Sequence, residues 1–266
     1  MKKALKIFAI ALMLSVMVVP AQAQRRTVHY LANYENEPYH FGFLLAYNQM
    51  MYTIKTVDNY QNLQIAPDAW PNAPISVPNT QYLSDNNVET VQTPGFTVGL
   101  IGSKRLGRYF DLRFIPSLSF SERRMRYDVA VVDLQDKISM QSFTKSIGTT
   151  FVEFPLNIKY RWKRYNNIGA YLFVGVNPKI DLASQKNNKL TDAQGNEFIN
   201  NLVTKRFDCA AEIGTGFDIY NQWFKMGIEL KMSYGFLDIV KNEAFIYTAP
   251  INQLRNKLFQ VSLLFE

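Results

Sequence analysis

Apolar and polar residues alternate with a period of two along most of the chain from residue 40 onward. In the segment 152–161 the apolar side chains occupy even positions, and the charged side chains occupy odd positions. The segments 207–219 and 224–236 repeat the pattern, and the apolar parity of all three carries no charge. Such alternation predicts β-strands with one apolar face. It occurs both in soluble β-sandwiches and in membrane β-barrels.

Segment length separates these two architectures. Sandwich strands usually contain about 5 or 6 residues, whereas a strand that crosses a membrane needs about 9 to 11. The alternating segments of this chain are of the longer kind. Eight are expected, near 40–54, 94–106, 110–122, 148–162, 167–183, 207–220, 223–236 and 256–266.

The connections between these segments alternate between two classes. Tight turns are expected around Gly107-Arg108, Tyr165–Asn167 and Asn221-Gln222, and the other four connections are long and polar. Both termini therefore lie on the side of the short turns. The sequence predicts an all-β fold, an eight-stranded antiparallel transmembrane up-and-down β-barrel with periplasmic termini and four long external loops, integral to the cell outer membrane.

The predicted external connections differ in composition. The segment 58–93 contains four prolines between Pro67 and Pro78, so we expect no regular strand pairing there. Arg123, Arg124 and Arg126 follow the third predicted strand and form a basic patch suited to lipopolysaccharide phosphates. The segment 181–206 is hydrophilic and lacks a complete calcium-loop pattern.

The first residues have the layout of a secretory signal peptide. Three lysines precede the apolar run Ile7–Val19, and a small-x-small cleavage motif follows it. We therefore expect a signal peptide at 1–23, a periplasmic N-terminal tail at 24–39 and the barrel at 40–266.

Composition limits the remaining classes of protein. With 266 residues, 47% of them hydrophobic, the chain has enough apolar material for one large domain, and its single cysteine excludes a disulfide-rich mini-protein. The net charge is +7, but without the three lysines of the signal peptide 26 basic and 22 acidic residues leave only +4. This mixed balance does not predict nucleic-acid binding.

The polar parity of the strands predicts the content of the bore. An eight-stranded barrel is filled by its own side chains, and buried charges need partners. We expect a structural barrel-interior charge cluster made of Arg113, Glu153, Lys159, Arg161, Asp208, Glu212, Asp218, Lys225, Glu229 and Lys231. A proton or ion path is the alternative role of the same residues. In either case no polypeptide passes through the barrel.

Aromatic residues gather beside the predicted short turns. Membrane barrels place such rings at the membrane interfaces. We therefore expect a periplasmic aromatic belt that contains Tyr109, Tyr160, Trp162, Tyr220, Trp223 and Phe265.

No catalytic, cofactor-binding or metal-binding motif stands out in the sequence. His29 and His40 lie at or before the periplasmic start of the first strand, too far from the external rim for a histidine-dependent hydrolase acting on outer-leaflet lipid. HExxH, P-loop and GxGxxG motifs are absent. We expect a non-enzymatic protein with no catalytic residue, no cofactor and no metal site.

Several short stretches, spread over most of the mature chain, form a specific combination. They are Pro38–Phe43, Tyr47–Met50, Pro94–Phe96, Leu106–Pro116, Ser119–Arg123, Glu153–Leu156, Phe207-Asp208, Gly216–Asp218 and Glu229–Lys231. The combination resembles the PorT family, outer-membrane components of the type IX secretion system in Bacteroidetes. The chain departs from the family pattern at Met51, where an acidic residue is frequent.

The resemblance implies a protein required for secreting proteins that carry a C-terminal sorting domain. Because the predicted bore is filled, we expect an accessory or assembly component of the translocon rather than the conduit. The expected partners are outer-membrane lipids and other type IX components, including a larger translocon barrel, and no nucleic acid. A small porin-like channel, a lipid-modifying barrel enzyme and an adhesin-type barrel remain as alternatives.

Overall fold

The computed structural model describes residues 28–58, 60, 64–65, 82–132, 138–183, 189–191, 197–199, 204–240 and 250–266. The expected signal peptide and the first residues of the tail lie outside these ranges, as does much of the segments 58–93 and 181–206. Within these ranges one short 3-10 helix, η1 (Tyr34–Asn36), is present, and the other regular elements are strands. No helix within the described ranges is long and apolar enough to cross a membrane.

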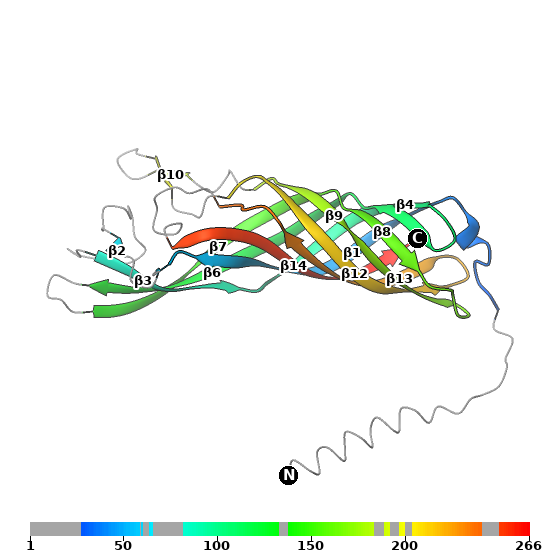
Figure 1. Cartoon of the computed structure of the whole chain (residues 1–266), viewed down its shortest axis with the longest axis horizontal. Coiled ribbons are helices and arrows are strands. Elements are labelled where there is room, and N and C mark those ends of the chain that lie inside the picture. Colours follow the sequence, from blue (N-terminus) through cyan, green and yellow to red (C-terminus); the bar gives the residue numbers. More distant parts are fainter. Residues whose placement is uncertain are drawn as a thin grey trace, which may run out of the picture.

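Fourteen strands are present in the described part of the chain. They are β1 (Tyr39–Thr56), β2 (Gln64–Ile65), β3 (Tyr82–Val91), β4 (Thr93–Arg105), β5 (Phe110–Phe114), β6 (Ser117–Val132), β7 (Ile138–Glu153), β8 (Leu156–Arg161), β9 (Ile168–Asp181), β10 (Lys189–Thr191), β11 (Glu197–Ile199), β12 (Phe207–Tyr220), β13 (Lys225–Gly235) and β14 (Ile251–Phe265). Twelve strands form one sheet, and β10 pairs separately with β11. The pairing of β12 with β9 closes the large sheet into a ring (Figure 1).

Eight antiparallel segments, which we call staves, form the wall of this ring. Five staves are single strands, and three are each built from two consecutive strands. β3 continues into β4 past Gln92, β5 into β6 across Ile115-Pro116, and β7 into β8 across Phe154-Pro155. Each stave pairs with the next one in the sequence, and the last strand, β14, pairs with β1. The predicted eight-stranded antiparallel up-and-down barrel is therefore confirmed.

The three predicted tight turns lie at one end of the barrel, together with the C-terminus (Figure 1). In the first turn the amide of Leu106 donates to the carbonyl of Phe110 at 2.9 Å. In the second turn Asn166 has a φ of 51°, a left-handed conformation that asparagine tolerates better than most residues. We call this end the turn end and the opposite end the loop end.

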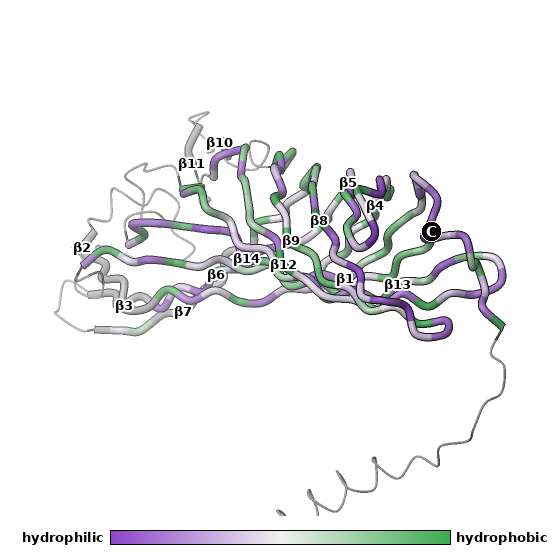
Figure 2. The backbone as a smooth tube through the Cα atoms, turned by 45° about the vertical axis from the view of Figure 1, so that its right-hand side comes forward, coloured by the Kyte–Doolittle hydropathy of each residue, from purple (hydrophilic) through white to green (hydrophobic). Residues whose placement is uncertain are grey.

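The two faces of the wall differ as the alternation predicts. On β13 the side chains of Ile228, Leu230 and Met232 point outward and are exposed, whereas Glu229 and Lys231 between them are buried. Apolar and polar residues accordingly alternate along the strands of the barrel (Figure 2). The apolar parity is the exterior, and the polar parity is the bore.

At the loop end three adjacent staves run further than predicted, and β3 is the unpredicted part of one of them. β6 extends to Val132 and β7 begins at Ile138, so the excursion expected after residue 122 takes the form of a long hairpin. We call the part of β6 and β7 beyond the pair Glu122–Gly148 the external hairpin. In Figure 1, β6 and β7 extend together with β3 past most of the barrel wall.

The expectation that the segment 58–93 forms no strand was wrong for its last third and for the two residues of β2, which pair with β3. β3 pairs with β6 over nearly its whole length. The reason is that the four prolines end at Pro78, so Tyr82–Val91 keeps the amide groups that a ladder needs.

Candidate functional site in the barrel interior

The bore is filled by charged side chains. All ten residues of the expected interior charge cluster lie there, and each is at most 9% exposed. They come from β5, β7, β8, β12 and β13, where each occupies the parity opposite the apolar one. Because burial removes the solvation of a charge, such groups need ionic or hydrogen-bonding partners.

Oppositely charged groups meet across the bore. Arg113 Nη2 on β5 lies 2.7 Å from Glu229 Oε2 on β13, a stave on the far side of the ring. Lys159 on β8 lies 2.7 Å from Asp218 on β12. These contacts tie non-neighbouring staves together through the middle of the barrel and occupy the space that a channel would need.

Further pairs form between nearby groups of the cluster. Lys231 Nζ lies 3.0 Å from Glu212 Oε1. The side-chain amide of Asn177 donates to Glu153 at 3.0 Å and to Glu212 at 2.8 Å, so it bridges two carboxylates. The polar network therefore continues along the bore.

Five buried charged residues were missed by the sequence reasoning. Arg123 pairs with Asp181 at 3.1 Å, and Lys179 with Asp208 at 3.4 Å. The missed residues are Asp111, Arg123, Lys179, Asp181 and Glu266. Parity could have found Asp111, because it lies two residues before Arg113 on the same strand.

Two aromatic rings close the remaining space in the middle of the bore. Tyr171 and Phe173 on β9 lie across the backbone of Gly216 and Gly214 on β12, where an added Cβ would come within 2.5 Å of either ring. The guanidinium carbon of Arg113 lies 5.6 Å and 4.9 Å from the centroids of these rings. Glycine is therefore required at both positions because a ring lies directly against the backbone, and not because of the backbone conformation.

Toward the loop end the filling becomes apolar. Beyond Arg123 the inward positions of β6 are Met125 and Tyr127, both at most 1% exposed. Tyr52 of β1 and Leu254 of β14 are also buried. The side chains of these four residues therefore fill the bore at this end.

At the turn end the chain folds back over the mouth of the barrel. We call the segment Val28–Pro38, which contains η1, the strap. Tyr34 of the strap donates through its hydroxyl to Glu266 Oε2 at 3.0 Å and stacks on His40 at 4.1 Å between centroids. Glu35 accepts a hydrogen bond from the Tyr220 hydroxyl at 3.0 Å. The strap is therefore bound to inward groups of three different strands or their ends.

The turn between β8 and β9 clamps the beginning of the strap. The Asn167 amide donates to the Val28 carbonyl at 2.8 Å and its carbonyl accepts from the Tyr30 amide at 3.1 Å. The Arg164 guanidinium donates to the carbonyls of Tyr30 and Leu31, and its carbon lies 3.8 Å from the centroid of the Tyr220 ring. The described part of the tail thus covers the mouth.

Protonation at the mouth follows from these contacts. Burial and the neighbouring Glu266 carboxylate raise the pKa of the Tyr34 hydroxyl. The hydroxyl therefore stays protonated and donates a hydrogen bond to Glu266. Burial alone would raise the pKa of Glu266, but the ammonium groups of Lys225 and Lys159 hold it well below its ordinary range. Lys225 also forms an ion pair with Glu266.

Five of the six residues expected in the aromatic belt lie on the exterior at the turn end. Tyr160 contacts both Tyr109 and Trp162, with centroids 6.2 Å and 5.4 Å apart, and Phe265 stacks on Phe43 at 4.9 Å. Trp223 is 83% exposed at the third turn.

Tyr220 does not belong to this belt. It is 3% exposed and points into the mouth. The expectation was wrong because Tyr220 shares its parity on β12 with Asp218 and not with the outward Phe217.

The expected basic patch of three arginines is not formed. Arg123 is 1% exposed and points into the bore, because β6 continues through this position and Arg123 falls on the inward parity. Arg124 and Arg126 point outward, where each pairs with an acid two residues away on the same strand, at 2.8 Å from Glu122 and 3.0 Å from Asp128. The external face is therefore largely neutralised within the strand.

The architecture defines a class of protein. A closed barrel with an apolar exterior, aromatic rings at one rim and a charge-paired bore is a transmembrane β-barrel of the outer membrane. The family model "Outer membrane protein beta-barrel domain" matches residues 21–241, and the chain belongs to this family. The protein is integral to the outer membrane, with its turn end facing the periplasm and its loop end facing outward.

Comparison with other proteins adds little to this assignment. No curated protein matches the chain. Among solved structures, Neisserial surface protein A is 9% identical with a TM-score of 0.40, covering 86% of this chain and 98% of that protein. OprG from Pseudomonas aeruginosa is 12% identical with a TM-score of 0.35, covering 84% and 93%. Similarities this low support no functional conclusion.

Proposed function

We propose that this protein is a non-enzymatic, closed outer-membrane barrel that supports type IX protein secretion as an accessory or assembly component rather than as the conduit. The proposal combines the filled bore with the resemblance to the PorT family. Its proposed partners are the other components of that system, including a larger translocon barrel.

One observation argues against a role of this barrel as the conduit for secreted proteins. The Arg113–Glu229 pair spans the bore between opposite staves with both side chains at most 2% exposed. An unfolded polypeptide would have to displace this pair, the rings of Tyr171 and Phe173, and the strap. Breaking a buried pair typically costs about 3–5 kcal/mol, so the bore of this barrel is not a route for cargo.

The stretches that carry the family resemblance also build the interior. Leu106–Pro116 contributes Arg113, and Glu229–Lys231 contributes two further charges of the bore. Residues that specify a filled barrel are therefore the ones that relate this chain to a secretion component, which favours a structural part in the secretion apparatus over a channel.

Gene deletion tests the proposal. We expect a deletion strain to retain sorting-domain cargo in the periplasm and a wild-type copy to restore secretion. Affinity purification from native outer membrane should recover a larger barrel with this protein. Normal export in the deletion strain would rule the proposal out.

The alternative of a small porin-like channel predicts a different measurement. A barrel filled as this one is should give no stable conductance in planar bilayers. Steady single-channel conductance from the purified protein, lost in a protein-free control, would favour the channel instead.

The external hairpin supports a second candidate function, that of an adhesin acting outside the membrane. In β6 and β7, Asp128 pairs in register with Ser142, so residues 129–141 can be replaced by a two-residue Asn-Gly turn that leaves Tyr127 in the bore. If secretion survives this replacement but surface attachment is lost, the adhesin function holds. If the secretion proposal is right, the variant with the shortened external hairpin should still assemble with its secretion partners.

A further inference from the structure

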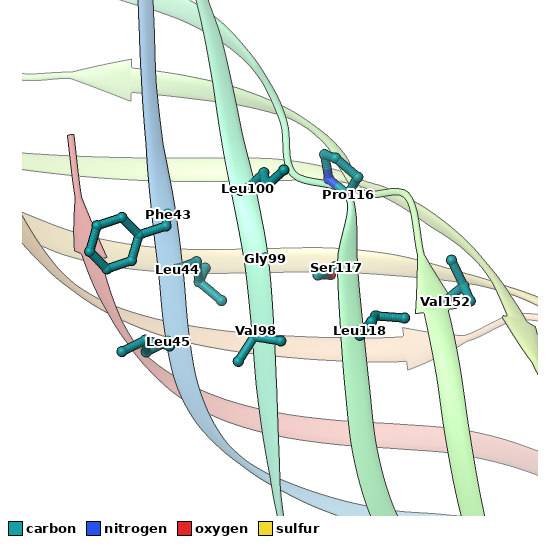
Figure 3. Close-up of a pocket in the computed structure, with 10 residues that line it drawn as sticks. All are labelled: Phe43, Leu44, Leu45, Val98, Gly99, Leu100, Pro116, Ser117, Leu118 and Val152. Carbon is teal, nitrogen blue, oxygen red and sulfur yellow. The ribbon is translucent and has the colours of Figure 1, made fainter.

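One edge of the external hairpin is not covered by any strand of the described part of the chain. In the closed wall β7 is paired on both sides, and Figure 3 shows Val98, Leu118 and Val152 side by side on β4, β6 and β7. The pairing of β7 with β9 covers only Phe151–Glu153, whereas its pairing with β6 continues to Ile138. Toward the loop end, β7 therefore has a ladder on one side only.

The last contacts of β7 with its neighbouring stave show which backbone groups face the uncovered side. The Thr150 carbonyl accepts from the Leu182 amide at 2.8 Å, and the Phe154 amide donates to the Pro178 carbonyl at 3.0 Å. In an antiparallel ladder, every second residue directs its amide and carbonyl to the same side. The even-numbered residues of β7 thus point away from β6. We call four of them the open edge: Ser142, Thr144, Ser146 and Gly148.

Side chains leave the open edge accessible. All four of its residues are exposed. The hydroxyls of Ser142 and Ser146 donate to Asp128 and Glu122 of β6, so they turn toward the paired strand and away from the uncovered backbone. A Cβ added at Gly148 would meet no atom of the described residues within 4 Å.

The open edge lies outside the hydrocarbon layer. On β6 the outward side chains change from apolar at Leu118 and Phe120 to charged at Glu122 and Arg124, and this change marks the external boundary of that layer. Gly148 pairs in register with Glu122, so the open edge begins at the boundary and continues outward. Unpaired backbone groups would be costly in lipid, whereas here water solvates them until a partner replaces it.

The open edge lacks the usual protection of edge strands. Prolines, bulges and very short strands commonly keep an edge from pairing with another chain. β7 contains no proline and pairs with β6 without a register shift over its 16 residues. Lys145 is the one charged residue from 142 to 148, and its backbone groups face β6. At the opposite edge of the same external sheet, β2 pairs with β3.

We propose that the open edge binds an extended segment of another polypeptide by β-strand addition on the external side of the membrane. The chemistry of the edge selects this occupant, because an extended backbone matches its amides and carbonyls at every second residue. Sugars and lipid headgroups have no such repeat. The small side chains of the open edge constrain the side chains of the bound segment little, so the main chain supplies most of the contact.

This inference does not depend on the secretion proposal. It also differs from the adhesin candidate, because the variant that lacks residues 129–141 keeps the open edge.

Amide hydrogen exchange of the purified, full-length mature protein tests whether the edge is open. The amides of the open edge should exchange at least about 100-fold faster than the odd-numbered amides between them, which face β6. Equal protection of the two sets would mean that this chain or a second copy already occupies the edge, and it would overturn the proposal.

Photo-cross-linking in living cells tests the occupant. A photoreactive p-benzoylphenylalanine is placed at position 148, where Gly148 leaves room for a side chain. Thr144→Pro removes one amide that faces the uncovered side and leaves the ladder with β6 in place. Thr144→Ala is the matched control, because it shortens the same side chain and keeps the amide.

We expect a cross-link to a different polypeptide in the Thr144→Ala protein and a yield at least about tenfold lower in Thr144→Pro. The proline leaves an acceptor of the bound segment without its donor. Heat-modifiable migration of both variants confirms that they are folded. Equal yields in the two variants, cross-links only to a second copy of the chain, or no cross-link at all would each overturn the proposal.

Discussion

Ion pairs of nearly the same length occur in two regions of this protein with very different surroundings. Arg113 and Glu229 lie 2.7 Å apart in the bore, with side chains 1% and 2% exposed. Arg124 and Glu122 lie 2.8 Å apart at the base of the external hairpin, with side chains 46% and 36% exposed. Distance alone therefore does not measure the contribution of a pair to stability; the solvent around it does.

The bore pairs and the hairpin pairs also constrain different parts of the structure. Three of the bore pairs, Arg113–Glu229, Lys159–Asp218 and Arg123–Asp181, join staves that are not neighbours, so their geometry fixes how the ring closes. The hairpin pairs join residues two apart on one strand and constrain nothing beyond their own face. We infer that the bore pairs select the register of the barrel, and that the hairpin pairs keep an exposed face soluble.

The largest expected effect comes from removing one member of a bore pair. Glu229→Leu leaves the Arg113 guanidinium buried without its anion and removes the acceptor of the Tyr171 hydroxyl. We expect a loss of about 3–5 kcal/mol in the free energy of unfolding. Urea titration in lipid vesicles, with heat-modifiable migration as the measure of the folded fraction, checks this.

The double variant Arg113→Met/Glu229→Leu is the matched control. Replacing both charges by apolar groups removes the uncompensated charge, so most of the lost stability should return. If the double variant is as unstable as the single variant, the bore pair does not act through charge compensation.

Much of this interior was predictable from parity, and the failures have a common physical cause. Alternation assigned Lys159 and Glu229 inward because each lies between apolar neighbours. It fails where the apolar pattern stops before the strand does. Arg123 has the inward parity of Ser117 and Ser119, but the sequence predicts a strand end near residue 122, whereas β6 continues to Val132. Strand ends depend on pairing with other staves, which a single sequence does not show.

The strap was beyond sequence reasoning for a different reason. The strap contacts groups far away in the chain, such as Glu266, and nothing local in Tyr34 or Glu35 marks them as partners.

The strap is intermediate between the bore and the external hairpin, because its hydrogen bond to Glu266 is partly buried. Tyr34→Phe removes the hydrogen bond to Glu266 and keeps the stacking on His40. We expect a loss of about 1–2 kcal/mol, together with faster proteolysis at the beginning of the strap. Tyr165→Phe, at a tyrosine 79% exposed in a turn, is the control and should leave both unchanged.

The pH dependence of stability provides a smaller effect of known sign. The pKa of Glu266 is lower in the folded barrel than its ordinary value of 4.5, so the unfolded chain binds more protons as the pH falls below that value. The contribution of Glu266 is thus complete above about pH 4.5 and is lost progressively below it. The urea midpoint of the wild-type protein should fall more between pH 5 and pH 3 than that of Glu266→Gln. Parallel pH profiles would show that this carboxylate is not the group responsible.

The smallest effect is expected at the external hairpin. Arg124→Ala removes a pair of good geometry, yet both partners are solvated, so the change in the free energy of unfolding should stay below about 1 kcal/mol. A double-mutant cycle with Glu122→Ala isolates the pair, and its coupling energy should shrink further in high salt because exposed charges are screened. The same cycle on Arg113 and Glu229 should give a larger, nearly salt-independent coupling. Equal coupling energies at the two sites would mean that the bore is hydrated as fully as the hairpin, and the conclusion that the barrel is closed would fail with them.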